Sequence, residues 1–348
     1  MVNIRHITTA TAKTWVSVGL CLLCQSSSAT LAMDKTGELS PEGSTPQTIQ
    51  TELAVANPMA WFDRITIASR QLNYVGVFSY QTGWRTETSR IVHRFANGEE
   101  KEHLEILDGS PREIIREGDN MRCVLPAQRT IIVGKMGIRN SFPGYLPQNH
   151  AELTANYRIH LEGVGRIAGL DAQKLVLEPR DELRYGHMLW VELQSGLLLK
   201  SQVIDANGKV IEQFAFSDVR IGGEINDELL TPSVKTSDDW HTVDVSGDHT
   251  ARIENQWALS EPLPGFTRLA TTQHRTGWPL QLVYSDGLAA ISIFIEPAEA
   301  GINARGYFAG GGAVNVFERI LNGYRITALG EAPASLVQRA AESIKELK

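Results

Sequence analysis

The fold of this chain is constrained most by a succession of short segments in which apolar and polar residues alternate. A period of two indicates strands with one buried face. Between these segments lie pairs typical of tight hairpin turns, such as Asn97-Gly98, Ser195-Gly196 and Asn207-Gly208. Short strands joined in this way predict an antiparallel sheet, either a sandwich or a barrel. The expected strands cover residues 74–80, 88–95, 101–107, 112–116, 121–125, 129–133, 157–164, 173–177, 187–193, 197–205 and 209–219.

One amphipathic helix is expected immediately before these strands. Asn57 and Pro58 are residue types that start a helix, with Asn as the cap and Pro in the first turn. The concave side of a curved sheet is the nearest place where the helix can bury an apolar face, so we expect the helix to lie there. The residues of that face recur at helical spacing and are Trp61, Phe62, Ile65, Ala68 and Leu72.

A further hairpin is expected near the C-terminus. The apolar runs 280–284 and 288–295 flank Ser285-Asp286-Gly287, and Asp-Gly between alternating apolar residues is a strong hairpin signal. Residues 266–272 and 324–329 are expected strands, whereas Val314–Leu321 fits either a helix or a strand. Pro333 opens a final helix whose apolar face extends to Ile344 and Leu347. These elements predict a small α+β domain.

The length of 348 residues suggests two domains. The polar and acidic segment 233–250 lacks periodic apolar residues and is expected to be the linker between them. We therefore expect a large N-terminal β domain at residues 57–232 and a small C-terminal domain at residues 251–348.

The N-terminus has the pattern of a secretory signal peptide. Arg5 and Lys13 precede a short apolar run at 15–24, and small and polar residues then lead to Ala32. We expect residues 1–32 to be removed by cleavage after Ala32 and the mature protein to reside in the periplasm. Residues 33–56 are polar and lack an apolar period, so they are expected to form a disordered leader.

The cysteines favour a soluble exported protein. Cys21 and Cys24 each follow a leucine, whereas lipoprotein processing requires a small residue at that position. After cleavage the chain keeps only Cys123, so no intramolecular disulfide can form. We expect Cys123 to be a buried strand residue rather than a reactive thiol.

No pattern of catalytic or metal-ligating residues stands out. His93 and His103 lie on neighbouring expected strands, but no cysteine or carboxylate pattern marks them as a metal site. The glycine-rich segment 306–312 lacks the Lys and Ser/Thr of a phosphate-binding loop, which favours a flexible loop or a close backbone contact. The formal net charge of −7 argues against a nucleic-acid partner. We expect neither enzymatic activity nor a cofactor nor a metal.

Residues 120–151 contain several cations and no acidic residue, in a chain that is acidic as a whole. An apolar, proline-rich run follows the cations. Cations beside exposed aromatic residues suit a ligand with an anionic head and an apolar body. Alternatively, the basic residues are solvated strand positions paired with acids such as Glu113 and Glu117. The candidate lipid-binding residues are Arg122, Arg129, Lys135, Arg139, Phe142, Tyr145 and Leu146.

Three stretches carry a resemblance to a known family: VYSDGLAAISIFIEP, then Gly310-Gly311-Gly312-Ala313, then NGYRITALGEAPASLVQRAAESI. Together they resemble the C-terminal domain of the RseB/MucB family, and the resemblance extends more loosely from about Asn57 onward. This family consists of periplasmic regulators of the envelope-stress sigma factor pathway. The resemblance implies an N-terminal domain similar to the lipoprotein carriers LolA and LolB. That fold is an unclosed antiparallel β-barrel with an apolar cavity, and here it would hold the helix in its concavity.

The resemblance also implies a function. Members of the family bind the periplasmic segment of a membrane-spanning anti-sigma factor and shield it from the first protease of a regulated cleavage cascade. Lipopolysaccharide or a related lipid is the implied releasing signal. We therefore expect a non-enzymatic negative regulator. No contact residue for the anti-sigma factor is carried over, and the oligomeric state stays open, a homo-oligomer included.

Two other functions are consistent with parts of the sequence. A periplasmic lipid or lipoprotein carrier would use the same cavity, but a bare carrier does not need the C-terminal domain. An envelope hydrolase is disfavoured because the sequence lacks the motifs of known nucleophiles.

Overall fold

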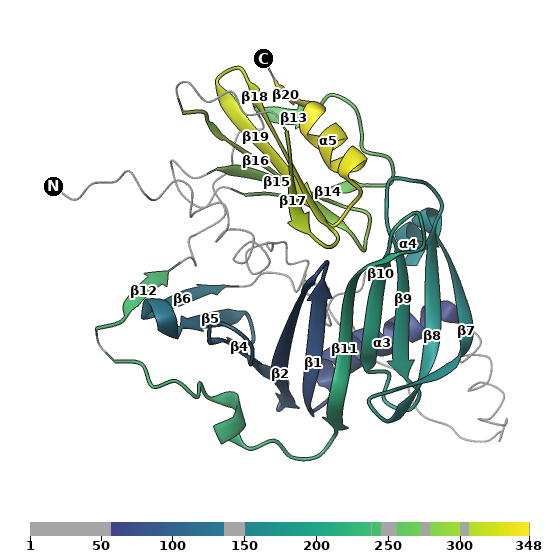
Figure 1. Ribbon diagram of the computed structural model, residues 1–348, viewed down its shortest axis with the longest axis vertical. Helices are drawn as coiled ribbons and strands as arrows, with labels where there is room; N and C mark the ends of the chain where they lie inside the picture. Colours follow the sequence, from purple (N-terminus) through teal and green to yellow (C-terminus); the bar gives the residue numbers. More distant parts are fainter. Residues whose placement is uncertain are drawn as a thin grey trace, which may run out of the picture.

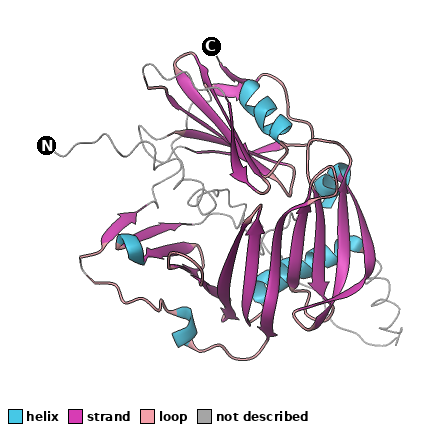
Figure 2. Cartoon of the chain, viewed as in Figure 1, coloured by secondary structure: helices cyan, strands magenta, loops and turns pink. Residues whose placement is uncertain are grey.

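The computed structural model describes residues 57–135, 150–237, 239–244, 256–272, 279–299 and 306–347 (Figure 1). A large sheet comes from the N-terminal part of the chain and a smaller one from the C-terminal part (Figure 2). The predicted signal peptide and leader, residues 1–56, lie outside the described residues.

Helix α3, Pro58–Gln71, begins where the sequence predicts. The Asn57 side chain accepts a hydrogen bond from the Met59 amide at 3.0 Å, which caps the helix. Trp61, Phe62 and Ile65 are buried and pack against strand residues of the large sheet. The predicted apolar face is therefore confirmed, and it lies against one face of the sheet. The short helix α4, His150–Asn156, contributes Leu153 to the same cluster.

The large sheet has the strand order β12-β6-β5-β4-β3-β2-β1-β11-β10-β9-β8-β7. All its pairs are antiparallel except β12 with β6. Strands β7 and β12 form its two edges, so the sheet is unclosed, as expected. The strands are β1 Tyr74–Thr82, β2 Arg85–Ala96, β3 Glu99–Ile106, β4 Arg112–Glu117, β5 Asn120–Leu125, β6 Thr130–Lys135, β7 Tyr157–Ile167, β8 Leu170–Pro179, β9 Gly186–Glu192, β10 Leu198–Ile204, β11 Val210–Ile221 and β12 His241–Asp244.

The two faces of this sheet differ in what covers them. We call the face that contacts α3 and its C-cap Leu72 the helix-bearing face. It carries a buried cluster that includes Tyr74, Phe78 and Phe216. The opposite, outer face carries Val75 and Val92, and here Ile225 and Leu230 pack on it from the segment that follows β11. Cys123 on β5 is buried, as expected.

The segment predicted as a linker, 233–250, differs from that expectation in its first part. Ser233 and Val234 donate backbone hydrogen bonds to the Glu113 carboxylate at 2.8 and 3.2 Å. Residues 241–244 then add strand β12 to the edge of the large sheet. Polar contacts hold this segment, which explains why no apolar period revealed its attachment. Residues 245–250 lie outside the described residues.

The small domain has a sheet of order β14-β15-β16-β19-β18-β17 and a two-stranded sheet of β13 with β20. Ile291, Ile293 and Ile295 on β16 are buried, which confirms the predicted hairpin face. Helix α5, Ala334–Glu342, packs across β18 and β19. The strands are β13 Trp257–Leu259, β14 Thr267–Thr272, β15 Leu280–Ser285, β16 Ala290–Pro297, β17 Gly306–Gly311, β18 Val314–Leu321, β19 Tyr324–Gly330 and β20 Ile344–Glu346.

One local prediction for this domain was wrong, and another was right in only one of its two alternatives. The final helix ends at Glu342, before Ile344 and Leu347. The chain then turns back, and Ile344 in β20 pairs with Leu259 in β13. Residues 306–311 form strand β17, where a loop was expected, and the close backbone contact falls at Gly312. Within the described ranges, the helices α3, α4 and α5 are too short or too polar to cross a bilayer.

Candidate functional site

The small domain contacts the large domain through the tips of two hairpins (Figure 1). Leu288, beside the β15–β16 turn, packs against the cluster that holds α3 in the large domain. In return Leu183, in the β8–β9 connection of the large domain, packs against the core of the small one. Each domain therefore packs a partly buried apolar side chain against the core of the other.

Asp286 at the β15–β16 tip forms a buried ion pair across this junction. Its Oδ2 lies 2.8 Å from Nη1 of Arg184, and neither side chain is exposed to solvent. The Tyr157 hydroxyl donates to the same oxygen at 3.1 Å. Burial and the neighbouring Asp286 raise the pKa of Tyr157 well above its ordinary value. The charge of Asp286 therefore holds an arginine and a tyrosine of the other domain.

The turn itself fixes Asp286 in place. Its second oxygen, Oδ1, accepts hydrogen bonds from the amides of Leu288 and Ala289 at 2.9 and 2.8 Å. Gly287 follows with a φ of 100°, which glycine adopts without strain. The Ser-Asp-Gly sequence predicts the turn correctly. The contact that this turn makes with the other domain could not be predicted from the sequence, because Arg184 and Tyr157 are distant from the turn along the chain.

Arg184 has further partners in both domains, Asp181 in the large one and Pro264 in the small one. Its Nε lies 2.9 Å from Oδ1 of Asp181, and its Nη2 donates to the Pro264 carbonyl at 3.0 Å. Burial alone would lower the pKa of Arg184, but the hydrogen bonds to Asp181 and the charge of Asp286 raise it. The guanidinium thus stays charged inside the junction.

The β17–β18 tip makes the second contact. The Ala313 amide donates to Oε2 of Glu212 on β11 at 3.3 Å, and the Tyr80 hydroxyl also bonds to this carboxylate. Burial raises the pKa of Glu212. Gly312 has a φ of 61°, and a Cβ there would overlap the Thr82 side chain. Together the two tips define one orientation between the domains.

The structure describes three of the predicted lipid-binding residues. In the strand register Val92 of the outer face stands opposite His103, His103 opposite Ile115, and Ile115 opposite Arg122. Arg122 therefore lies on the outer face. Its Nη2 donates to the Thr236 hydroxyl at 3.4 Å. Lys135 is exposed at the end of β6 and pairs with Asn120 on the same face.

Arg129 lies after the 3₁₀ turn Pro126–Gln128 and pairs with Asp239 at 3.1 Å, with both side chains exposed. Arg122 and Arg129 thus contact the segment that leads into β12, where Arg129 has an acidic partner. The acids named in the alternative, Glu113 and Glu117, form ion pairs with His103 and Lys101 instead. The predicted residues Arg139, Phe142, Tyr145 and Leu146 lie outside the described residues, so the lipid site stays a prediction.

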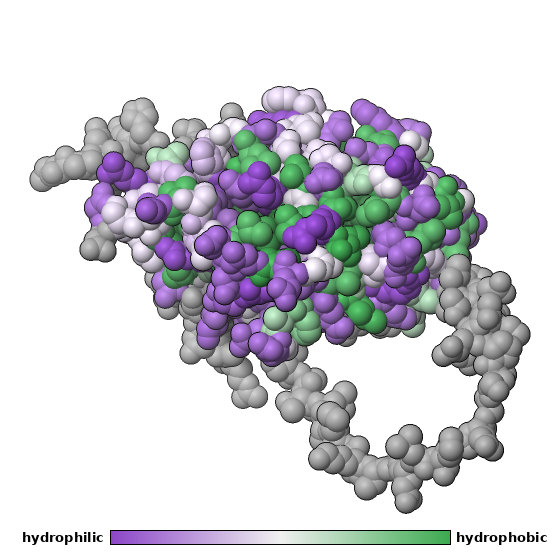
Figure 3. Space-filling model, turned by 90° about the horizontal axis from the view of Figure 1, so that it is seen from below, coloured by the Kyte–Doolittle hydropathy of each residue, from purple (hydrophilic) through white to green (hydrophobic). Residues whose placement is uncertain are grey.

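Some apolar side chains of the large domain are exposed. Trp84, in the β1–β2 turn, is 86% exposed, and Ile67 on α3 is 56% exposed. Hydrophobic residues also gather near the middle of the face seen from below, where hydrophilic residues border them (Figure 3). Exposed apolar groups mark binding surfaces where they form a contiguous patch. Trp84 and Ile67 belong to separate elements and do not by themselves define such a patch.

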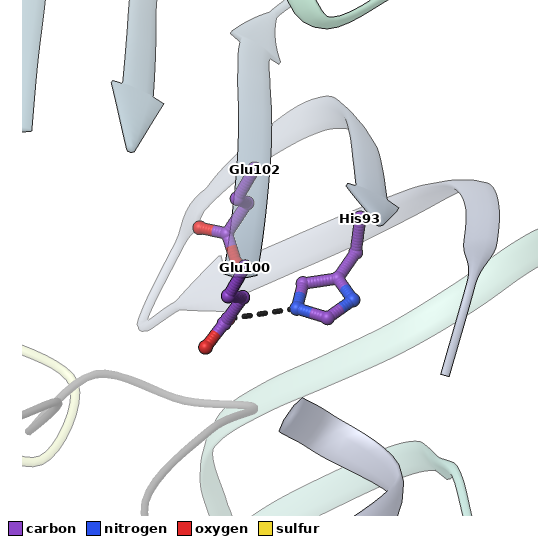
Figure 4. Close-up of side chains that lie close together, drawn as sticks. All are labelled: His93, Glu100 and Glu102. Carbon is purple, nitrogen blue, oxygen red and sulfur yellow. Dashed lines mark hydrogen bonds and ion pairs between the residues drawn. The ribbon is translucent and has the colours of Figure 1, made fainter. Parts of the chain in front are cut away.

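The helix-bearing face carries charged side chains near the β2–β3 turn and on the neighbouring part of β4. His93 is fully buried, and its Nε2 lies 2.7 Å from Oε1 of Glu100 (Figure 4). Glu102 stands directly opposite His93 in the strand register and pairs with Arg116 at 3.2 Å. Neither acid was predicted from the sequence as a site residue, although the Asn97-Gly98 turn sets this register. This part of the face is therefore polar, unlike the apolar part beneath α3.

Comparisons with known proteins also divide the chain into an N-terminal and a C-terminal domain. The family profile of the MucB/RseB N-terminal domain matches residues 57–234, and that of the MucB/RseB C-terminal domain matches residues 251–345. The sigma factor AlgU regulatory protein MucB of Pseudomonas aeruginosa is 29% identical over 300 residues, which is 83% of this chain and 91% of the relative. The sigma-E factor regulatory protein RseB of Haemophilus influenzae is 25% identical over 292 residues, covering 81% and 89%.

A solved structure is similar over both domains. The crystal structure of MucB in complex with MucA(peri) matches 84% of this chain and 100% of its own, with a TM-score of 0.66 and 26% sequence identity.

Proposed function

Since the chain belongs to the MucB/RseB family, we propose that it is a periplasmic negative regulator of an envelope-stress sigma factor. In this proposal it binds the periplasmic segment of a membrane-spanning anti-sigma factor. Binding shields that segment from the first protease of a regulated cleavage cascade, so the sigma factor stays sequestered.

The observation that carries the proposal is the likeness to MucB bound to MucA(peri), which includes the whole of that chain. A likeness restricted to the large sheet would fit a carrier equally well. Its extension over the small domain favours a protein that uses both domains. The relatives are named regulatory proteins, which supports a role without catalysis.

The domain junction gives a physical reason why such a protein would bind an extended segment well. Asp286 and Glu212 hold the two domains in one orientation through buried contacts. A surface that spans both domains is then formed before the partner arrives, which lowers the entropy cost of binding. A carrier that only encloses an acyl chain gains nothing from this arrangement.

Lipid release is the second part of the proposal. The acid-free stretch 120–151 supports an anionic lipid as the signal, with Arg122 and Lys135 as cations that it would meet on the outer face. Lipopolysaccharide should then reduce binding of the anti-sigma segment in proportion to its own occupancy.

Capture from periplasmic and membrane extract tests the proposal. The tagged mature chain should retain a single-span membrane protein with a sigma-factor-binding cytoplasmic part. A mixture of lipoproteins in its place would contradict regulation and favour the carrier. An unrelated exported protein with the same tag serves as the control for nonspecific capture.

A further inference from the structure

His93 on β2 lies between two carboxylates on the neighbouring strand β3. Its Nε2 and one oxygen each of Glu100 and Glu102 all lie within 4.8 Å of one another. Figure 4 shows the three side chains pointing toward one another from two adjacent strands. No metal site was predicted from the sequence here, because only the strand register brings the three residues together.

The hydrogen-bond geometry of the His93 imidazole requires a proton or a metal ion at Nε2. Nδ1 lies 2.6 Å from the Leu72 carbonyl oxygen, so this nitrogen must carry a hydrogen. A neutral ring has one such hydrogen, which leaves a lone pair on Nε2. That lone pair faces Oε1 of Glu100 at 2.7 Å, and two acceptors at this distance repel each other. Either a proton or a metal ion must therefore lie between Nε2 and the Glu100 carboxylate.

We infer that His93, Glu100 and Glu102 form a binding site for a divalent transition metal ion, of which zinc fits best. One imidazole and two carboxylates are ligands that zinc accepts, with water completing the tetrahedron. Zinc bonds of about 2.0–2.2 Å place ligand atoms about 3.4 Å apart. The present separations, 2.7 Å at the shortest and at most 4.8 Å, lie on both sides of that value.

The surroundings of the three residues match those of metal ligands. A metal-binding histidine usually donates its other ring N–H to a carbonyl or carboxylate, as His93 does to Leu72. Ligating carboxylates are likewise held by further hydrogen bonds, and Arg116 contacts Oε1 of Glu102 at 3.2 Å. The Glu100 side chain is 21% exposed, so an ion can reach the site from solvent.

A second histidine in the same sheet provides a matched control. His103 on the outer face has Nδ1 at 2.9 Å from the Leu229 carbonyl and Nε2 at 2.8 Å from Oε2 of Glu113. Here the carboxylate is already bonded to the Ser233 and Val234 amides. Among the described residues, His103 is not part of any group of three potential ligands. It should therefore bind no metal.

The test is zinc binding by the mature chain after treatment with a chelator. Competition with a chromophoric zinc indicator should show one ion per chain, and calorimetry in two buffers should show a proton released on binding. Glu102→Gln should weaken binding at least about tenfold, in line with the loss of a ligand. His103→Gln should bind zinc as the parent does. Zinc should raise the melting temperature of the parent and of His103→Gln, and not that of Glu102→Gln.

The opposite results would overturn the site. If the parent binds no zinc at a concentration of 0.1 mM, the cation at His93 is a proton and the inference is wrong. It is equally wrong if Glu102→Gln and His93→Gln bind zinc like the parent. Because His93 is buried and its replacement can disturb folding, Glu102→Gln is the deciding variant, with circular dichroism as the check on its fold.

Discussion

Replacing Asp286 by Asn should loosen the contact between the two domains. The Asn side chain keeps the oxygen that accepts from the Leu288 and Ala289 amides, so the turn stays intact. In place of the second oxygen it presents an NH₂ group to Arg184 and Tyr157, which are both donors. The substitution thus removes one charge at the junction and leaves the hairpin unchanged.

The expected magnitude follows from the burial of the pair. Removing one partner of a buried ion pair costs about 3–5 kcal/mol, because the other charge is left uncompensated. Arg184 keeps Asp181, so the lower end of this range applies. A loss of about 3 kcal/mol shifts the equilibrium between docked and undocked domains by roughly a hundredfold toward the undocked state.

Hydrogen exchange and limited proteolysis measure this shift. The amides of the β15–β16 turn should lose protection, while those of the buried strand β16 should not. Asp227→Asn is the control, since Asp227 pairs with Arg94 but is 80% exposed and should cost at most about 1 kcal/mol. If the Asp286 variant matched the parent in exchange and in cleavage rate, the buried pair would not fix the domains.

Three further results are expected. Gly312→Ala should destabilise the chain by at least about 1 kcal/mol more than Gly323→Ala in urea unfolding, because both have positive φ but only Gly312 meets another side chain. Burial raises the pKa of Glu212, so its contribution to stability is full below the ordinary pKa of 4.5 and is lost as pH rises through the folded value. Relative to Glu212→Gln, the parent should therefore lose stability in urea titrations as pH rises above 4.5; an equal slope would contradict this. The third result concerns binding of a fluorescent lipid A analogue. Substituting Gln for the four cations should slow association and flatten its salt dependence; these are Arg122, Arg129, Lys135 and Arg139. Substituting Ser for the three apolar residues should weaken equilibrium binding; these are Phe142, Tyr145 and Leu146. Parent-like lipid binding by both would exclude this site.

Local patterns in the sequence predicted most strands and the capped helix. Alternating residues place their side chains on opposite faces whatever the partner strand is, so 74–80 and 209–219 could be identified individually. The Asn57 cap and the turn at Ser285-Asp286-Gly287 also depend on neighbouring residues only. These features were predictable because their causes lie within a few residues.

Contacts between distant residues were not predictable in this way. The pairing of Asp286 with Arg184 joins a turn of one domain to a connection of the other, and neither segment carries a sign of its partner. Strand β12 was not predicted because it is short and largely exposed, and because its partner strand β6 is distant along the chain. The proximity of Glu102 to His93 could in principle have been predicted from the sequence. The predicted Asn97-Gly98 turn implies this register once the two strands are aligned.

Protection of the anti-sigma segment from proteolysis tests the central claim most directly. The purified periplasmic segment is incubated with the protease that starts the cleavage cascade, with and without a molar excess of the mature chain, and the intact segment is quantified over time. The proposed function predicts that the chain slows cleavage in proportion to the bound fraction, and that lipopolysaccharide restores it. Cleavage at the same rate under saturating binding, or no binding at all, would contradict the claim that this protein regulates the pathway by shielding its partner.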